Sequence, residues 1–331
     1  SIDNKGCEFG LQFTENASNN RFCLEFYKNI GQSDFLILNI IILPVQICCM
    51  QLTILIHCPD QTGIISAVTG FVHRQKGNIV YLDQHVDKQA GVFFMRLESE
   101  FEQPVQLDSF TEGFGQDLAQ KFDMQWEIYP DWYRPKMALF VSKYNHCLYD
   151  LLSRFNSGEL TVDIPFILSN HLDLKPIADQ FGITFYHVPV TKETKEAAED
   201  KQLELLKKHE IDFIVLARYM QIVSPKVIDV YPQRIINIHH SFLPAFAGAK
   251  PYHAAFERGV KIIGATSHYV TEDLDAGPII EQDVTTVSHT HSVKDFIAKG
   301  RDLERIVLSR AVQLHVARKT MVYNNKTVIF S

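Results

Sequence analysis

The stretch "MALFVSKYNHCLYDLLSRFNSGELTVDIPFILS" (residues 137–169) decides the fold of the larger part of this chain. It begins with the short apolar run MALFVS, continues through a helical segment and ends in a second apolar run, DIPFILS. Two short apolar strands joined through a helix are typical of a parallel sheet, because parallel neighbours need a long crossover connection. The sequence therefore predicts an α/β domain that starts near residue 137.

Three further apolar runs extend this pattern toward the C-terminus. ITFYHV (183–188), DFIVLA (212–217) and RIINIH (234–239) read as buried strands, and helical segments lie between the first four strands. We predict an open, mostly parallel, Rossmann-like sheet with helices on both faces over residues 137–331. The remaining expected elements are a strand over 262–270, a second strand after Gly277-Pro278, a helix over 293–318 with a Ser292/Asp295 capping box, and a final hairpin.

The region before residue 137 shows a different order of elements. A buried strand, LTILIHC (52–58), is followed by an amphipathic helix, two strands joined by a polar turn, a second amphipathic helix, and a last strand, MQWEIY (124–129). The order β-α-β-β-α-β is that of the ferredoxin-like fold. We therefore predict a separate small domain over residues 50–130, followed by a proline-bounded polar linker at residues 131–136.

Composition limits the classes of partner. The chain has 331 residues, of which 46% are hydrophobic and 21% charged, as in globular proteins. A net charge of −7 gives no reason to expect binding to nucleic acid. The six cysteines form no C-x-x-C pair and include an adjacent pair, which suits neither a disulfide framework nor a zinc site. We therefore expect a protein of the reducing cytoplasm.

Residues 1–49 fit neither domain. Their apolar run FLILNIIILPVQICCM, which ends at Met50, is short for a membrane span and is interrupted by polar residues and a proline. No basic segment lies close in front of it, and the region has too many acidic residues for a transit peptide. We expect an extension outside the folded domains, with Met50 as the start and no association with a membrane. An extra strand on the small domain and a targeting segment are the alternatives.

The stretch NIHH ends the predicted strand at 234–239, and ligands of parallel sheets collect at the carboxyl ends of strands. Side chains two positions apart share a face of a strand, so Asn237 and His239 are expected to act together, with His240 on the other face. A mononuclear metal needs three or four converging ligands. Because the adjacent histidines diverge, we expect no metal here.

An acidic turn follows the predicted strand at 262–270. In this turn Asp275 precedes Ala276 and Gly277, which are small enough to let a substrate approach closely. Taken alone, Asp275 would be read as an ordinary turn residue. Together with Asn237 and His239 it forms a set that could polarise a carbonyl group, stabilise charge and transfer a proton.

The loop after the first strand, SKYNHCLYDLL (142–152), contains no glycine. Backbone amides need glycines to approach a phosphate closely, and neither of the common nucleotide-binding motifs occurs in this loop. The loop therefore argues against NAD, ATP or a phosphorylated co-substrate at this position, and we expect no cofactor.

The small domain resembles the ACT domain, a small-molecule sensing module. Its loop HCPDQTG (57–63) is similar to the loop that holds an amino-acid effector in such domains, and unpaired amides at a helix start favour a carboxylate. The resemblance implies an amino acid bound at Asp60 and Gly63. A domain that serves only to form a homo-oligomer is the alternative, and a homo-oligomer is expected in either case.

Residues 137–331 resemble the folate-dependent formyltransferases, whose N-x-H pair and distant aspartate in a DAG-like turn match Asn237, His239 and Asp275. Phrases such as HVPVTKETKEAAED (187–200) and LARYMQIVS (216–224) resemble the formyltetrahydrofolate deformylases in particular. The resemblance implies that those three residues are catalytic. It also implies a folate pocket lined by Arg218, Tyr219, Met220, Ile222 and His268, of which Met220 and Ile222 could otherwise be plain core and His268 a hydrogen-bonded strand residue.

The resemblance implies hydrolysis of 10-formyltetrahydrofolate to tetrahydrofolate and formate, in one-carbon and purine metabolism. A sister transferase formylates glycinamide ribonucleotide with the same three residues, but its phosphate-binding Gly/Ser loop has no counterpart here, so water is the expected acceptor. The tRNA-formylating relative needs a basic face, which a net charge of −7 does not suggest. A non-catalytic amino-acid-binding regulator is a further alternative. In the hydrolase, Asp275 would accept a proton from water, while Asn237 and His239 would stabilise the oxyanion.

Overall fold

The computed structural model describes residues 14–16, 21–23, 50–245 and 251–331. Residues 1–49 and 50–331 form two compact units. In the first unit, two short strands, β1 (Thr14–Asn16) and β2 (Arg21–Cys23), pair antiparallel. The remainder of the N-terminal segment, and with it most of what we expected there, lies outside the described residues.

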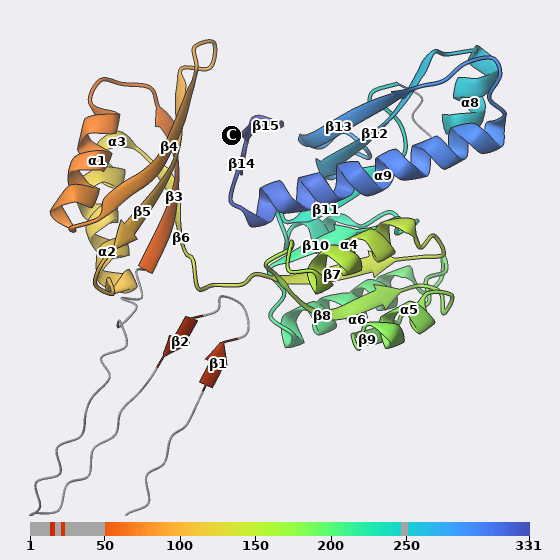
Figure 1. The fold of residues 1–331 in the computed structure, drawn as a ribbon, viewed down its shortest axis with the longest axis horizontal. Coiled ribbons are helices and arrows are strands. Elements are labelled where there is room, and N and C mark those ends of the chain that lie inside the picture. Colours follow the sequence, from red (N-terminus) through yellow and green to blue (C-terminus); the bar gives the residue numbers. More distant parts are fainter. Residues whose placement is uncertain (1–13, 17–20, 24–49, 246–250) are drawn as a thin grey trace, which may run out of the picture. The chain divides into compact units, whose positions relative to one another are not determined.

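A four-stranded antiparallel sheet with the order β4-β5-β3-β6 begins the second unit (Figure 1). Its strands are β3 (Met50–Pro59), β4 (Asn78–Asp87), β5 (Val92–Phe101) and β6 (Gln125–Pro130). The helical segments are α1 (Ile64–Arg74), α2 (Leu107–Phe114), η1 (Gly115–Ala119) and α3 (Gln120–Phe122). The predicted ferredoxin-like order is confirmed, with the π-helical turn η1 as a detail that the apolar spacing did not indicate.

Aromatic side chains hold these helices to the sheet. Phe71 of α1 is 1% exposed, and its ring lies 5.2 Å from that of Phe110 and 5.4 Å from that of Phe114, both edge to face. Phe101 of β5 contacts Phe110 in the same way at 5.8 Å. Edge-to-face aromatic pairs stabilise a core beyond the area that they bury. Phe71 is therefore central to the packing of α1 on the sheet.

The larger sheet has seven strands in the order β13-β12-β11-β10-β7-β8-β9. The run from β11 to β9 is parallel, whereas β12 and β13 are antiparallel, so the predicted mostly parallel sheet is confirmed. The strands are β7 (Lys136–Val141), β8 (Asp163–Ser169), β9 (Thr184–His187), β10 (Phe213–Leu216), β11 (Ile235–His239), β12 (Ile262–Tyr269) and β13 (Ile279–Thr286).

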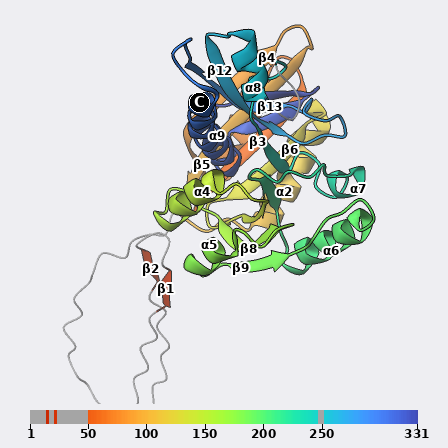
Figure 2. The same cartoon turned by 90° about the vertical axis from the view of Figure 1, so that its right-hand side faces the viewer.

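Helices cover this sheet, and Figures 1 and 2 both show α5 and α6 beside β8 and β9. The long helix α9 (Val293–Val316) begins at the predicted capping box, in which Ser292 and Asp295 bond each other's backbone amides. The other helices are α4 (His146–Asn156), α5 (Lys175–Gln180), α6 (Lys195–Lys208), α7 (Pro225–Ile228) and α8 (Pro251–Arg258). The chain ends in the predicted hairpin, β14 (Thr320–Tyr323) and β15 (Lys326–Ile329).

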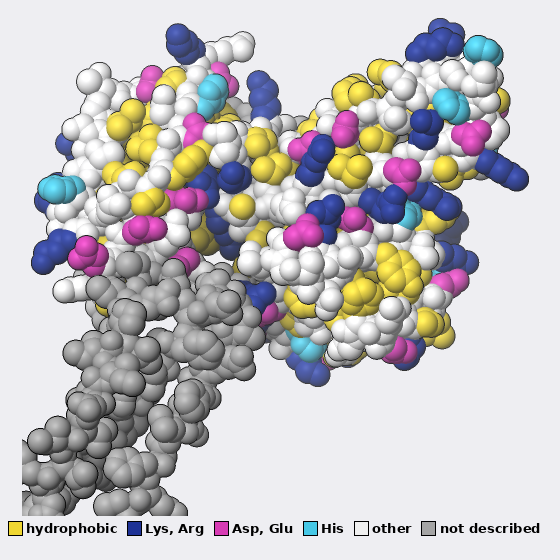
Figure 3. All heavy atoms as spheres, viewed as in Figure 1, with side chains coloured by type: hydrophobic (Ala, Val, Ile, Leu, Met, Phe, Trp, Pro, Cys, Tyr) yellow, Lys and Arg dark blue, Asp and Glu magenta, His cyan; other side chains and the backbone are white. Residues whose placement is uncertain are grey.

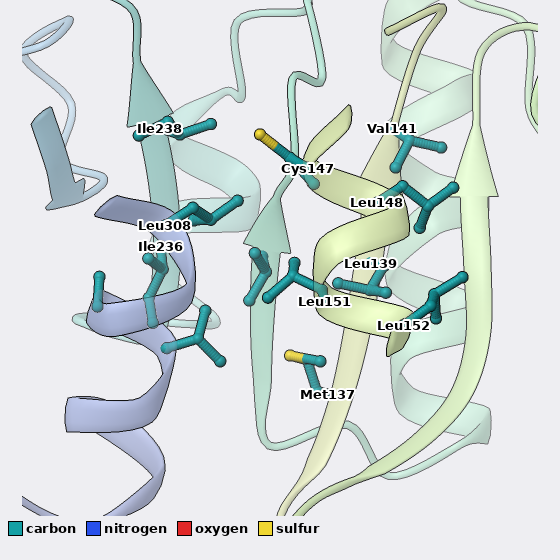
Figure 4. Close-up of a cluster of buried hydrophobic side chains, with 14 of the residues drawn as sticks. Met137, Leu139, Val141, Cys147, Leu148, Leu151, Leu152, Ile236, Ile238 and Leu308 are labelled. Atoms are coloured by element: carbon teal, nitrogen blue, oxygen red, sulfur yellow. The ribbon is translucent and has the colours of Figure 1, made fainter. Parts of the chain in front are cut away.

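Both faces of the central strands are buried, as expected for a parallel sheet between helices. Figure 4 shows one face, where side chains from four elements meet. They are Met137, Leu139 and Val141 of β7, Cys147, Leu148, Leu151 and Leu152 of α4, Ile236 and Ile238 of β11, and Leu308 of α9. Ala138 and Phe140 alternate with the β7 residues and pack on the opposite face, against Leu205 and Leu206 of α6. This packing fixes the strand ends that carry the site.

The C-terminal hairpin contacts the four-stranded sheet. Arg96 of β5 donates through Nε to the Arg318 carbonyl at 2.9 Å, and through Nη2 to the Ala317 carbonyl at 3.0 Å. Met321 and Phe330 pack in one buried cluster with Leu55 of β3 and with residues of β5. The hairpin therefore joins the small sheet to the end of α9.

The visible surface mixes acidic and basic side chains, as Figure 3 shows. This distribution agrees with the net charge of −7, and neither indicates a basic face for nucleic acid. Within residues 50–245 and 251–331, every helix is too short or too polar to cross a lipid bilayer.

We predict that Phe71→Ala lowers the free energy of unfolding by about 3–5 kcal/mol, because it leaves a cavity beside the rings of Phe110 and Phe114. Ile65→Ala is the matched control on the same helix, since the Ile65 side chain is 43% exposed, and it should cost less than about 1 kcal/mol. Equilibrium urea unfolding measures both changes. Equal losses for the two variants would contradict this account of the packing.

Candidate active site

Strand β11 places Asn237 and His239 at its carboxyl end, next to the antiparallel strand β12. The register pairs Asn237 with His268 and His239 with Thr266. Directly opposed side chains of an antiparallel pair lie within contact distance, and Asn237 Nδ2 is 3.2 Å from His268 Nε2. His268 is 2% exposed and His239 is 6% exposed. The cross-strand register therefore brings His268 to the predicted pair.

The turn between β12 and β13 brings in Asp275. Its backbone has the left-handed φ of 56°, which is uncommon for a residue with a side chain. Gly277 passes so close to β12 that an added Cβ would lie 1.8 Å from the Tyr269 carbonyl oxygen. Glycine is therefore required there, and the Tyr269 amide donates to the Pro278 carbonyl at 2.9 Å. These contacts hold the turn over the end of β11.

In this position Asp275 faces both site histidines. Its Oδ2 lies 3.2 Å from His239 Nδ1, and its Oδ1 lies 3.8 Å from His268 Nε2. Hydrogen bonding from His239 is the main cause that holds the pKa of Asp275 well below its usual range, against the opposing effect of partial burial. The Asp275 carboxyl group is therefore ionised throughout the neutral range.

The hydrogen bonds restrict where protons lie. His268 Nδ1 is 2.9 Å from the Tyr269 carbonyl oxygen, which can only accept, so Nδ1 carries a proton. In the neutral ring Nε2 then accepts from Asn237 Nδ2. His239 Nδ1 donates to Asp275, whereas His239 Nε2 is buried without a hydrogen-bond partner among the described residues. His239 Nε2 and the second amide proton of Asn237 are thus available to a bound polar group.

A cavity of about 350 Å³ joins these residues to the predicted folate-binding loop. All eight residues that the sequence assigned to the site line it: Arg218, Tyr219, Met220, Ile222, Asn237, His239, His268 and Asp275. Met220 is 49% exposed and Ile222 is 61% exposed, so the alternative that they are plain core is wrong. Exposed apolar side chains beside a polar cluster suit a ligand with an apolar ring system.

Tyr219 contributes differently from its neighbours. It is 6% exposed, its ring lies 5.4 Å from that of Phe140, and its hydroxyl accepts from Gln202 Nε2 at 3.0 Å. Burial raises the pKa of Tyr219 to about 12. Tyr219 therefore supports the loop from the core side and keeps its hydroxyl engaged there.

His239 and His240 lie closer together than expected for adjacent residues on opposite faces of a strand. Strand β11 ends at His239, so His240 already begins the next loop. The two rings lie 5.1 Å apart, and the His240 ring lies 5.9 Å from that of Tyr252 on α8. Both residues border the cavity, but Asp275 contacts His239 and, more distantly, His268. Proximity of the rings reflects the end of the strand and not a pair of metal ligands aimed at one point.

The predicted effector residues lie apart, in the loop between β3 and α1. The Asp60 amide donates to the Gly91 carbonyl at 2.8 Å, and Gly63 precedes α1 with φ of 96°. Both residues are exposed, and α1 has no side-chain cap. Its first amides are therefore open to a small acidic ligand.

A buried polar group beside the cavity was missed by sequence reasoning. Glu304 of α9 accepts from His146 Nε2 at 2.8 Å and from the Tyr252 hydroxyl at 2.7 Å, and Arg218 Nε lies 3.3 Å from it. The four residues come from distant segments, so their spacing carries no pattern. The one available signal was Glu304 itself, an acidic residue beside Leu303 on the apolar stripe of a helix.

We predict that carbon-13 NMR of labelled carboxyl groups will show Asp275 still ionised near pH 4, where an ordinary aspartic acid is half protonated. His239→Leu removes the main donor and should move the titration midpoint of Asp275 up, toward the ordinary value. A wild-type Asp275 that titrates like an exposed aspartic acid would refute the assigned contacts.

Comparison with known proteins gives the family of the chain. A family model described as formyl transferase matches residues 135–312, and an ACT domain model matches residues 52–108. A formyltetrahydrofolate deformylase of Synechocystis sp. is 51% identical over 284 residues, which are 84% of this chain and 98% of the relative. A second one, from Escherichia coli K12, is 41% identical over 274 residues, which are 82% of this chain and 95% of the relative.

Solved structures give the same result. A formyltetrahydrofolate deformylase from Pseudomonas syringae is 46% identical and superposes with a TM-score of 0.83, covering 85% of this chain and 95% of that one. A phosphoribosylglycinamide formyltransferase from Anaplasma phagocytophilum is 28% identical with a TM-score of 0.56, covering 60% of this chain and 96% of that one. The deformylase structure matches most of this chain, whereas the formyltransferase structure matches only part of it. The chain therefore belongs to the formyltetrahydrofolate deformylase family.

Proposed function

We propose that this protein hydrolyses 10-formyltetrahydrofolate to tetrahydrofolate and formate, and so serves one-carbon and purine metabolism. The observation that carries the proposal is an ionised Asp275 held beside His239, with Asn237 next to them, in a cavity that also exposes Met220 and Ile222. Family membership agrees with this activity. The reaction as proposed uses side chains and water and requires no cofactor.

The first step is attack of water on the formyl carbon. A water oxygen forms the new bond to carbon, the carbonyl electron pair moves to oxygen, and Asp275 takes the proton that the water loses. Asn237 Nδ2 and a protonated His239 Nε2 donate to the developing oxyanion. A carboxylate with a lowered pKa is a weak base, so the hydrogen bonds that Asn237 and His239 donate to the oxyanion must lower the barrier to attack.

The second step breaks the bond between carbon and N10. The oxyanion electron pair re-forms the carbonyl, the electron pair of the carbon–nitrogen bond moves to nitrogen, and Asp275 returns its proton to N10, which leaves as the amine of tetrahydrofolate. Formic acid remains and ionises to formate. His268, with Nδ1 bonded to the Tyr269 carbonyl, orients Asn237 through its Nε2 throughout the cycle.

Substrate binding is assigned to the loop after β10. Met220 and Ile222 would contact the apolar faces of the folate rings. Tyr219 holds the loop to the core through Gln202. Arg218 lines the same cavity, although its side chain lies against Glu304.

Buried free thiols suit a reducing compartment. Cys58 and Cys147 are both buried and unpaired, and burial raises the pKa of Cys58 to about 11. Thiols of this kind stay protonated and inert. We accordingly assign the reaction to the cytoplasm.

We predict that Asp275→Asn lowers formate release by about 10²–10⁴ while folate binding, followed by tryptophan fluorescence or calorimetry, persists. Asp273→Asn, at an exposed carboxylate of the same turn, is the matched control and should keep most of the rate. Wild-type turnover by Asp275→Asn would contradict the proposed mechanism.

The acceptor decides between the alternatives in the same assay. Formate released from 10-formyltetrahydrofolate in water alone supports the hydrolase. Turnover that depends on added glycinamide ribonucleotide would indicate a transferase, and the absence of turnover under both conditions would indicate a non-catalytic regulator.

The ACT domain model suggests an amino-acid effector, and we propose that it binds at the loop of Asp60 and Gly63 in a homo-oligomer. The C-terminal hairpin offers a route to the site. Tyr81 of β4 donates to the Ser331 carbonyl at 2.6 Å, and Asn325 Nδ2 donates to the Ala276 carbonyl at 2.9 Å, next to Asp275. A change in the small sheet could therefore reach the catalytic turn through one hairpin.

We predict that at least one free amino acid changes the apparent affinity for substrate by about fivefold or more. Asn325→Asp replaces the donor amide with an acceptor and should weaken this response, whereas Asn324→Asp, at the adjacent position of the same turn, should keep it. Formate release measured across the common amino acids tests both statements. A rate that none of them changes would remove the effector proposal.

A further inference from the structure

A buried ion cluster connects the start of α4 with α9 and with the segment after β10. Glu304 is 1% exposed and is bonded by His146 at 2.8 Å and by Tyr252 at 2.7 Å. The Arg218 guanidinium lies 3.3 Å from Glu304 in an ion pair that lacks the alignment of a hydrogen bond. His146 and Arg218 together hold the pKa of Glu304 below its usual range despite its burial. A carboxylate with these partners is ionised and fully engaged.

Further contacts tie the same loop to the folate-binding loop. The Met220 amide donates to Ser142 Oγ at 3.1 Å, and Ser142 Oγ donates to Asn170 Oδ1 at 2.6 Å. The Tyr144 ring lies over the Arg218 guanidinium at 5.0 Å. The start and the end of the loop after β7 are thus both attached to the segment that follows β10.

The order of strands in the sheet fixes the position of this cluster relative to Asn237 and His239. In the sheet, β10 lies between β11 and β7. Arg218 follows β10 directly, so it stands between the loop after β7 and the pair Asn237 and His239 at the end of β11. Arg218 also lines the cavity together with that pair, and the His240 ring links His239 to Tyr252. Arg218 therefore forms the wall of the cavity on its β7 side, and Glu304 with its partners His146 and Tyr252 supports Arg218 from behind.

We propose that Arg218, Glu304 and His146 determine acceptor specificity by keeping this wall closed, so that water reaches the formyl carbon and a larger amine does not. The proposal rests on the hydrolase function and names the residues that limit it to water. The Arg218 side chain is 9% exposed and occupies this side of the cavity, where its guanidinium is held beside Glu304.

A bound metal ion explains the cluster of His146, Cys147 and Glu304 less well than the ion pair of Arg218 with Glu304 does. His146, Cys147 and Glu304 offer ligand atoms within 4.8 Å of one another. However, burial raises the pKa of Cys147, so its thiol stays protonated, and Arg218 already supplies a positive charge to Glu304. A cation at this point would face the guanidinium at close range.

The test follows the fate of the formyl group. The full chain is incubated with 10-formyltetrahydrofolate and glycinamide, and formate and N-formylglycinamide are measured by mass spectrometry. Arg218→Ala with Glu304→Ala removes both charge and volume, whereas Arg218→Met with Glu304→Gln removes the charge and keeps the volume. We expect the alanine pair to raise the share of N-formylglycinamide by about tenfold or more over the wild type, and the volume-matched pair to raise it little.

The outcomes separate this proposal from the hydrolase assignment. Formate from the wild type in the absence of glycinamide supports the hydrolase, whatever the variants do. The wall proposal is overturned if the wild type already formylates glycinamide to a similar share, or if the folded alanine pair releases formate alone. It is also overturned if both pairs transfer equally, because charge and not volume would then be responsible.

Circular dichroism shows whether the alanine pair folds. If it does not fold, a variant at an exposed position tests the proposal instead. Tyr144→Ala removes the ring over Arg218 at a side chain that is 41% exposed, and Tyr149→Ala is its control at 40% exposure on α4. Tyr144→Ala should form N-formylglycinamide above the wild-type share, and Tyr149→Ala should not. If the alanine pair is unfolded, equal shares from these two variants overturn the proposal.

Discussion

The antiparallel pairing of β11 with β12 is the constraint on which the site depends. It places His268 opposite Asn237, and the turn that ends β12 returns Asp275 to within 3.2 Å of His239. Gly277 allows that return, because any side chain there would collide with the Tyr269 carbonyl. Asp275 has a left-handed backbone conformation, and the hydrogen bond from His239 stabilises its negative charge. One strand pair and one turn thus set the positions, the protons and the charge of the catalytic group.

Sequence alone predicted those parts of the molecule that follow from local periodicity. Alternation along a strand was enough to pair Asn237 with His239, whereas Asp275 stood out only in combination with that pair and through the family resemblance, because taken alone it read as an ordinary turn residue. The sequence did not predict that His240 would remain near His239, because the strand ends between them. Nor did it predict Glu304, whose partners lie on three other segments that only the tertiary fold brings together. Met220 and Ile222 were expected in the folate pocket on the resemblance, with plain core as the alternative, and the fold shows that both are exposed.

The same sheet accounts for how one fold could serve different acceptors. Asn237 and His239 lie at the end of β11, whereas the proposed acceptor wall is formed by the segments that follow β7 and β10. In this chain those segments are held together by Ser142, Tyr144 and the ion pair of Arg218 with Glu304. A relative named for formylation of phosphoribosylglycinamide shares the fold at 28% identity. Changes in these two segments could redirect the formyl group without altering the catalytic set.

The central claim is that water held beside Asp275 attacks the formyl carbon. Single-turnover reaction in water enriched in oxygen-18, with glycinamide present, tests it most directly when the formate is analysed by mass spectrometry. The account predicts formate with one solvent oxygen and negligible formylated amine. Formate without solvent oxygen, or a formyl group found mainly on the amine, would contradict it.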